Sequence, residues 1–252
     1  MSSTLSRTGR GHSPDVEETD GKSELQPSTS GAVRARALTE TLRALYGSRD
    51  RSFRQHPTDS LIATILSQHT ADRNSGAAFL RLGERYETWE EIAYADPDEL
   101  AETIRCAGLA NIKAARIQAT LHALQDRYGT MDLGFLRDLP LEEAREALRD
   151  LPGVGPKTAA CVLLFSCGLP ALPVDTHVHR LALRLGLIEK GVSAERAHVE
   201  LERLVEPDDV YDFHVNLIAH GRRVCLAREP RCSMCPLQKE CAWYAGRMEV
   251  AS

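Results

Sequence analysis

The sequence predicts an all-α protein, and two observations support this prediction. Apolar residues recur at spacings of three and four along most of the chain, as at Leu61, Ile65 and Leu66, and this is the period of a helix face. No stretch sustains the alternation of β-branched and polar residues that a strand requires. We therefore expect helices joined by short connections.

The first part of the chain divides into a polar tail and a series of amphipathic helices. Residues 1–33 are rich in Ser, Thr and Gly and nearly lack aliphatic side chains, so we expect a disordered tail there. Leu38, Leu42 and Leu45 then share one helix face. Later helix boundaries are marked by start residues at Pro57, Pro97 and Asn111 and by stop residues at Gly108, Gly129 and Gly168.

The segment LPGVGPKTA, residues 151–159, lies between two predicted helices. It resembles part of a phosphate-binding loop, but a P-loop needs a glycine directly before its lysine and a buried strand before the loop. Here Pro156 precedes the lysine, and the preceding segment is helical. Gly153 and Gly155 permit positive φ, and their N–H groups form an anion nest suited to a DNA phosphate. The pattern predicts a helix-hairpin-helix over about residues 141–167.

Lys157 follows this turn, and its residue type is informative. The chain has five lysines among its 31 basic residues, so a lysine in a chain that prefers arginine indicates chemistry that arginine cannot perform. A guanidinium stays protonated, whereas a lysine amine can act as a nucleophile. A second phosphate contact is the alternative interpretation. Asp175 follows a Gly/Pro-rich loop at a helix start, where it is expected both to cap the helix and to assist the lysine.

Charge and hydropathy limit the possible partners and location. The net charge of −5 argues mildly against nucleic acid as a partner, but residues 222–247 carry six basic and two acidic side chains. No apolar run approaches the roughly 20 residues that a membrane span needs. The N-terminal segment lacks the apolar core of a secretory signal. We therefore expect a cytoplasmic protein with no membrane partner.

Four of the seven cysteines crowd the C-terminus within 17 residues, in the spacing C-x6-C-x2-C-x5-C. In a cytosolic chain such a group indicates metal ligands rather than disulfides. A zinc site is possible, but one compact loop of four thiolates suits an iron–sulfur cluster better. The remaining three cysteines lie in apolar helical stretches and are expected to be small buried hydrophobes. The proposed ligands are Cys225, Cys232, Cys235 and Cys241, and the other three are Cys106, Cys161 and Cys167.

The hairpin, the loop with Asp175 and the cysteine spacing, in this order, resemble endonuclease III, the iron–sulfur branch of the helix-hairpin-helix DNA glycosylases. The resemblance runs from about residue 34 to 247. It implies a helix-hairpin-helix DNA glycosylase fold of two helical domains, with a [4Fe-4S] cluster loop at the C-terminus. Residues 57–171 would form a six-helix domain, and residues 34–56 plus 172–252 a discontinuous cluster domain.

The resemblance also implies a mechanism. DNA would lie across the cleft between the domains, and the damaged nucleotide would rotate into it. The amine of Lys157 would attack the sugar C1′, displace the base and form a Schiff base, with Asp175 helping to deprotonate it. β-Elimination would then cut the strand. This describes a bifunctional DNA glycosylase and abasic-site (AP) lyase of base excision repair that acts on oxidised pyrimidines.

Further residues are assigned to DNA binding by the same resemblance. The segment ILSQHTADRN places His69 where the family has a gap-filling glutamine, with Gln68 one position earlier, so either is a candidate. Asp72 matches a family aspartate, and Leu109 matches an intercalating leucine whose aromatic neighbour is replaced by Ala110. The other implied DNA contacts are His177, Gly153, Gly155, Arg228 and Arg231, although Glu229 replaces a lysine common in the family.

The implied partner is double-stranded DNA that contains damaged bases or abasic sites, bound by a monomer in a bacterial or archaeal cytosol, at the nucleoid. A monofunctional or mismatch-specific glycosylase is one alternative. A non-catalytic damage-sensing module that keeps the cluster and the hairpin is another. A ferredoxin-like electron carrier is a third, but the cluster would occupy a small share of such a chain.

Overall fold

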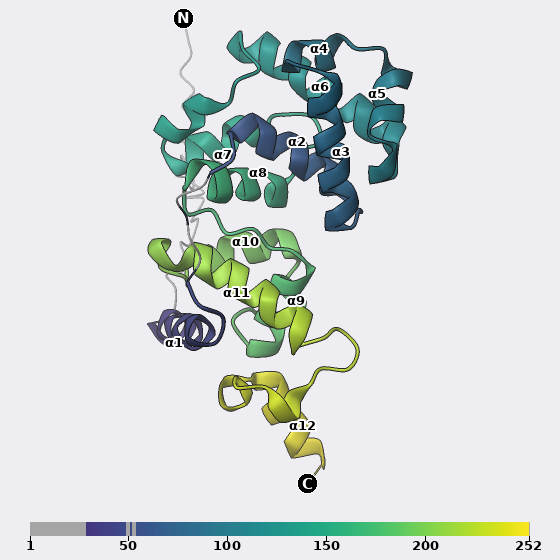
Figure 1. Ribbon diagram of the computed structural model, residues 1–252. Helices are drawn as coiled ribbons and strands as arrows, with labels where there is room; N and C mark the ends of the chain where they lie inside the picture. The colour runs from purple at the N-terminus through teal and green to yellow at the C-terminus, as the bar shows by residue number, and fades with distance from the viewer. Residues whose placement is uncertain (1–28, 49–50, 52–53, 252) are drawn as a thin grey trace, which may run out of the picture.

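The computed structural model describes residues 29–48, 51 and 54–251. Within these residues the regular structure is helical and no strand forms, so the all-α prediction is confirmed (Figure 1). No helix in this part of the chain is long and apolar enough to cross a membrane. The α-helices are α1 (Thr29–Tyr46), α2 (Pro57–Ser67), α3 (Asp72–Arg85), α4 (Trp89–Tyr94), α5 (Pro97–Thr103), α6 (Ala110–Tyr128), α7 (Leu141–Arg149), α8 (Pro156–Val162), α9 (Thr176–Leu185), α10 (Ala194–Glu202), α11 (Val210–Arg223) and α12 (Ala242–Ala251).

Shorter turns of helix join these elements. A single π-helical segment, η3 (Leu163–Cys167), continues α8 and ends at Gly168, which has a φ of 74°. The 3-10 segments are η1 (Arg105–Ala107), η2 (Gly134–Asp138), η4 (Pro207–Asp209), η5 (Cys232–Met234) and η6 (Gln238–Glu240).

The apolar helix faces bury two separate hydrophobic clusters. One cluster fills the space among α2 to α8 and holds Leu61, Ile65 and Leu121, each fully buried. The other lies among α1, α9, α10 and α11, with Leu38 and Phe213 among its fully buried members. Burial of each such side chain contributes about 1.5–3 kcal/mol to folding. In Figure 1 the first group of helices forms the upper lobe and the second group, with α12, forms the lower lobe.

The two lobes are in direct contact. Leu164 of η3 belongs to the lower cluster, although the chain around it packs in the upper one. The chain passes between the lobes twice, before α2 and again along the extended residues 168–175. The division into one domain of residues 57–171 and another of residues 34–56 plus 172–252 stays a prediction.

The N-terminal prediction needs one correction. Residues 1–28 of the expected tail lie outside the described residues, but residues 29–33 are the first residues of α1. The hydrophobic pattern misses this start because the first turn buries nothing, and Val33 is 65% exposed. The helix is held further along by Arg43, which pairs with Asp209 at 2.6 Å and with Asp212 at 3.0 Å.

Candidate active site

Lys157 is the second residue of α8, directly after the hairpin turn. Its side chain is exposed, and its amine makes no hydrogen bond or ion pair with any described residue. On the same helix face one turn later lies Cys161, a partly buried thiol whose pKa is raised to about 11 by burial. Lys157 is thus a lysine without a structural partner on a rigid helix end.

Asp175 is the N-cap of α9, as the sequence predicts. Its Oδ1 accepts a hydrogen bond from the backbone N–H of Val178 at 2.7 Å. Its Oδ2 has no hydrogen-bond partner among the described residues. Burial raises the pKa of the Cys161 thiol, while the Lys157 ammonium lowers it and the Asp175 carboxylate raises it, so both charged groups lie in the surroundings of Cys161.

His214 is a neighbour of this pair that sequence reasoning missed. It lies on α11 with 3% exposure, and its Nδ1 is 2.8 Å from the carbonyl oxygen of Pro173. Burial lowers the pKa of His214 to about 4, while the Asp175 carboxylate raises it and the Lys157 ammonium lowers it. A neutral His214 therefore donates from Nδ1 to the loop that carries Asp175. Its signal in the sequence is weak, because a histidine on an apolar helix face is usually a core residue.

The hairpin turn separates the roles of its two glycines. Gly153 has a φ of 75°, and a Cβ there would lie 2.4 Å from the side chain of Arg116, so only glycine fits. Gly155 has an extended φ of −88°, which any residue adopts, and a Cβ there would meet no atom within 4 Å. Of the two glycines that permit positive φ, only Gly153 adopts it, while Gly155 caps α8 and faces open space.

Gln68 and His69 follow α2, and the structure distinguishes them. Gln68 is half-buried, with its amide nitrogen 3.3 Å from Thr158 Oγ1 and its amide oxygen accepting from Arg116. His69 is exposed and adopts a left-handed φ of 54°. The Gln68 side chain is thus held by Thr158 and Arg116, while the His69 side chain is exposed to solvent.

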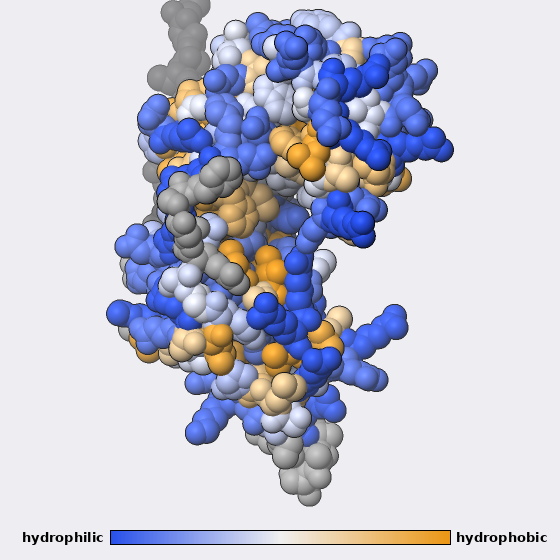
Figure 2. Space-filling model, in the orientation of Figure 1, coloured by the Kyte–Doolittle hydropathy of each residue, from blue (hydrophilic) through white to orange (hydrophobic). Residues whose placement is uncertain are grey.

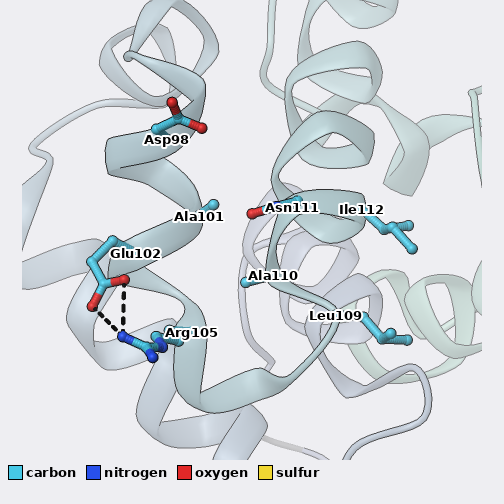
Figure 3. Close-up of a pocket in the computed structure, with 8 residues that line it drawn as sticks. All are labelled: Asp98, Ala101, Glu102, Arg105, Leu109, Ala110, Asn111 and Ile112. Atoms are coloured by element: carbon cyan, nitrogen blue, oxygen red, sulfur yellow. Dashed lines mark hydrogen bonds and ion pairs between the residues drawn. The ribbon is translucent and has the colours of Figure 1, made fainter.

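Leu109 has a similar backbone in a neighbouring loop. Its φ is 50°, and its side chain is 54% exposed just before α6. Figure 3 shows Leu109 and Ile112 projecting to one side of the helix, whereas Ala110 and Asn111 face a shallow groove that Asp98 and Glu102 of α5 also line. Leu109 and His69 are the two non-glycine residues with positive φ in the described part of the chain.

Asp72 and Arg222 connect the two lobes. Asp72 is the first residue of α3, and its Oδ2 lies 3.0 Å from Nη2 of Arg222 near the end of α11. Both side chains are largely exposed. In Figure 2 the surface is hollowed between the lobes on the right of the view, with apolar side chains visible inside the hollow.

The remaining DNA-binding candidates lie on the lower lobe. His177 on α9 has its Nδ1 3.1 Å from Nη2 of Arg180, and Arg180 also donates to the backbone of Gly221 at 3.1 Å. Because a guanidinium only donates, the proton of neutral His177 sits on Nε2. Arg228 is exposed, and exposed Arg231 donates to the carbonyl oxygen of Arg223 at 3.4 Å.

The four C-terminal cysteines line one pocket beside α9 and α12. All are free thiols and half-buried, and burial raises the pKa of Cys232 and Cys235. Arg184 donates to Cys225 Sγ at 3.2 Å, and His220 Nε2 lies 3.4 Å from Cys235 Sγ. Within the described residues no three such side chains lie close enough to hold a single metal ion.

The other cysteines are only partly as expected. Cys167 is buried with 6% exposure, whereas Cys106 and Cys161 are only partly buried.

Comparison with known proteins identifies the family. The sequence pattern of the HhH-GPD superfamily base excision DNA repair proteins matches residues 62–207, which is more than half of the chain. The chain belongs to this superfamily. The HhH-GPD match runs from within α2 to beyond α10, and thus includes the hairpin, Lys157 and Asp175. The predicted resemblance to endonuclease III is confirmed.

Individual HhH-GPD relatives agree with this assignment. The chain is 37% identical over 164 residues to a putative DNA glycosylase of Arabidopsis thaliana, covering 65% of this chain and 56% of the relative. It is 37% identical over 192 residues to endonuclease III of Thermotoga maritima, covering 76% of this chain and 85% of the relative. A solved trapped covalent intermediate of endonuclease III with DNA matches with a TM-score of 0.73 and 30% identity, over 86% of this chain and 98% of that one.

Proposed function

We propose that the protein is a bifunctional DNA glycosylase and AP lyase of base excision repair, with Lys157 as the nucleophile. The uncharged amine attacks C1′ of the extruded nucleotide, the C1′–N bond to the base breaks, and the base leaves with a proton. The C1′–O4′ bond then breaks as the sugar ring opens, O4′ takes a proton, and C1′ and the lysine nitrogen form a Schiff base that makes the C2′ proton acidic. Its loss expels the 3′ phosphate by β-elimination, which cuts the strand.

The observation that carries this proposal is the exposure of Lys157 and its lack of a bonding partner. The side chain is exposed at the start of α8 and has no partner among the described residues, and both Lys157 and Asp175 lie in the surroundings of Cys161. A lysine kept for folding would be paired or would cover apolar surface. The endonuclease III relatives and the trapped covalent intermediate support the same chemistry.

Asp175 supports both halves of the reaction in this proposal. Its Oδ1 is fixed by the Val178 N–H, so the carboxylate has one orientation and Oδ2 is available. Oδ2 accepts a proton from the Lys157 ammonium and then offsets the positive charge that develops on the sugar. His214, held neutral, keeps a further positive charge away from this pair.

DNA is the proposed partner. Gly155 and the following helix end offer backbone N–H groups to a phosphate. His177, Arg228 and Arg231 lie on the lower lobe and are proposed to contact further phosphates. His69 and Leu109 enter the duplex, His69 at the gap left by the extruded base and Leu109 between the remaining bases. Asp72 contributes to this surface through Arg222.

A [4Fe-4S] cluster is the proposed cofactor, held by Cys225, Cys232, Cys235 and Cys241. The donor set fits, because four free thiols line one pocket and one of them, Cys225, already accepts a hydrogen bond from Arg184, which favours a thiolate. The cluster would stabilise the loop that carries Arg228 and Arg231.

Oxidised pyrimidines are the proposed substrates. The experiment that tests the function is borohydride trapping on duplexes with an abasic site or an oxidised pyrimidine. We expect a covalent protein–DNA adduct with the natural chain and none with Lys157→Ala. Glycosylase activity without any adduct would instead indicate a monofunctional enzyme. DNA binding without either activity would indicate a damage-sensing module. Purified protein with broad brown absorbance would support the cluster, and a colourless protein that holds zinc would contradict it.

A further inference from the structure

Lys113 on α6 is a buried lysine that the mechanism above does not use. Its side chain is 2% exposed, and burial lowers its pKa. Its Nζ lies 2.6 Å from the carbonyl oxygen of Leu66, 2.5 Å from Thr70 Oγ1 and 2.9 Å from the carbonyl oxygen of Ala107. An ammonium has three N–H donors, so every donor is used.

The acceptors of Lys113 belong to two different segments. Leu66 lies in the last turn of α2 and Thr70 in the loop after it, whereas Ala107 ends η1. Carbonyl groups at helix ends lack intrahelical partners and carry partial negative charge, so a cation there is favourable. Thr70 Oγ1 also donates to the carbonyl oxygen of Ala107, which joins the two segments directly.

The burial of this amine asks for a reason beyond packing. Burying a charge is costly, so the three hydrogen bonds of the ammonium must offset that cost. None of the acceptors is a carboxylate, so Lys113 forms no ion pair here. What the ammonium does is fix three acceptors at one point.

The two segments that meet at Lys113 carry the two left-handed residues. His69 directly precedes Thr70, and Leu109 follows Ala107 by two residues. Such backbone conformations are unfavourable for residues other than glycine and persist only where the surroundings fix them. The Lys113 ammonium holds both loops at once, together with the hydrogen bond from Thr70 to Ala107.

We propose that Lys113 is a positioning residue that sets the spacing between His69 and Leu109, and that base extrusion from duplex DNA depends on it. This inference rests on the proposed function, in which these two side chains enter the duplex. The next helical turn of α6 extends the arrangement. Arg116 donates to Gln68 and packs against Gly153, so one face of the helix connects both loops to the hairpin.

The test compares Lys113→Met with a control of similar structural cost. Thr58→Val is suitable, because the buried Thr58 hydroxyl also joins two segments of the upper lobe, donating to Met131 at 3.0 Å and accepting from Leu133 N–H at 3.0 Å. Each variant is assayed on a duplex lesion and on a single strand with an abasic site, where no base must be extruded. A 2-aminopurine opposite the duplex lesion reports extrusion through its fluorescence.

We expect Lys113→Met to lower excision from the duplex by about tenfold to a hundredfold, since small misplacements have effects of this size. Cleavage of the single strand should change by less than about twofold, and the fluorescence rise should be lost. Thr58→Val should leave the ratio of the two activities unchanged. Equal losses on both substrates, or no loss on either, would overturn the inference.

Two further arms keep the result interpretable. Should Lys113→Met not fold, Thr70→Val removes one acceptor and is expected to shift the same ratio in the same direction by a smaller factor. An unchanged ratio in Thr70→Val would then count against the inference. Failure of the natural chain to give a borohydride adduct would count against the proposed function instead, because Lys113 has no part in that step.

Discussion

The upper lobe contains Lys157 beside the hairpin and Lys113 beside the loops of His69 and Leu109. The two lysines differ sharply in burial and in hydrogen bonding. Lys113 is 2% exposed with three acceptors on one amine. Lys157 is exposed and has no hydrogen bond among the described residues. Residue type therefore does not reveal which lysine performs chemistry. The fold engages every donor of the Lys113 amine and leaves the Lys157 amine available.

The largest expected effect removes the reactive amine. Lys157→Ala should lower strand cleavage on abasic DNA by about a thousandfold or more, because no other group can form the Schiff base. The free energy of unfolding should stay within about 0.5 kcal/mol of the natural value, since the side chain is exposed. Cleavage rates together with urea unfolding check both statements. Retained cleavage by Lys157→Ala would show that Lys157 is not the nucleophile.

The next effect concerns stability. Lys113→Met should lower the free energy of unfolding by about 1–3 kcal/mol, because buried acceptors lose their donor. The matched substitution Lys157→Met should have almost no effect on it. Urea unfolding of both variants measures the difference directly. Equal stabilities would show that the ammonium of Lys113 contributes nothing beyond its volume.

A pH dependence should come from His214. Its pKa is about 4 in the folded protein and about 6.5 when unfolded, so the unfolded chain binds the extra proton first. The stability that His214 contributes above pH 6.5 is therefore lost as the pH falls towards 4, by about 2 kcal/mol at pH 5. His214→Asn keeps a donor near the Nδ1 position and cannot titrate. Unfolding at pH 7 and pH 5 should show a smaller decrease for this variant, and an identical decrease would contradict the assignment.

The smallest effects separate the two glycines of the hairpin. Gly153→Ala should destabilise the protein by about 1–2 kcal/mol, because it needs a left-handed backbone and displaces Arg116. Gly155→Ala should leave stability within about 0.5 kcal/mol, since its backbone is extended and its surroundings are open. It should nevertheless weaken DNA binding, because the added methyl group stands where a phosphate approaches. Binding titrations at one fixed salt concentration test this.

The sequence predicted the parts of the protein that depend on local pattern. The helical period, the hairpin between two helices and the N-cap at Asp175 are set by neighbouring residues, and the structure contains them all. The start of α1 was missed because its first turn buries no side chain.

Contacts between distant segments could not be predicted in the same way. His214 meets the loop of Asp175 from another helix, and Lys113 meets Leu66 across a gap of 47 residues. The choice between Gln68 and His69 was open for the same reason, because it depends on where Arg116 and Thr158 lie. The roles assigned to the site residues remain predictions for the experiments above.

The ion pair of Asp72 and Arg222 has a consequence for DNA binding as salt changes. Each phosphate that a free arginine neutralises releases condensed counterions, and this release makes affinity fall steeply with salt. Arg222 is already neutralised by a carboxylate of the other lobe at 3.0 Å. If Asp72 keeps this partner, Arg222 releases no counterion. The salt dependence of binding should then be shallower than the number of arginines on this face suggests.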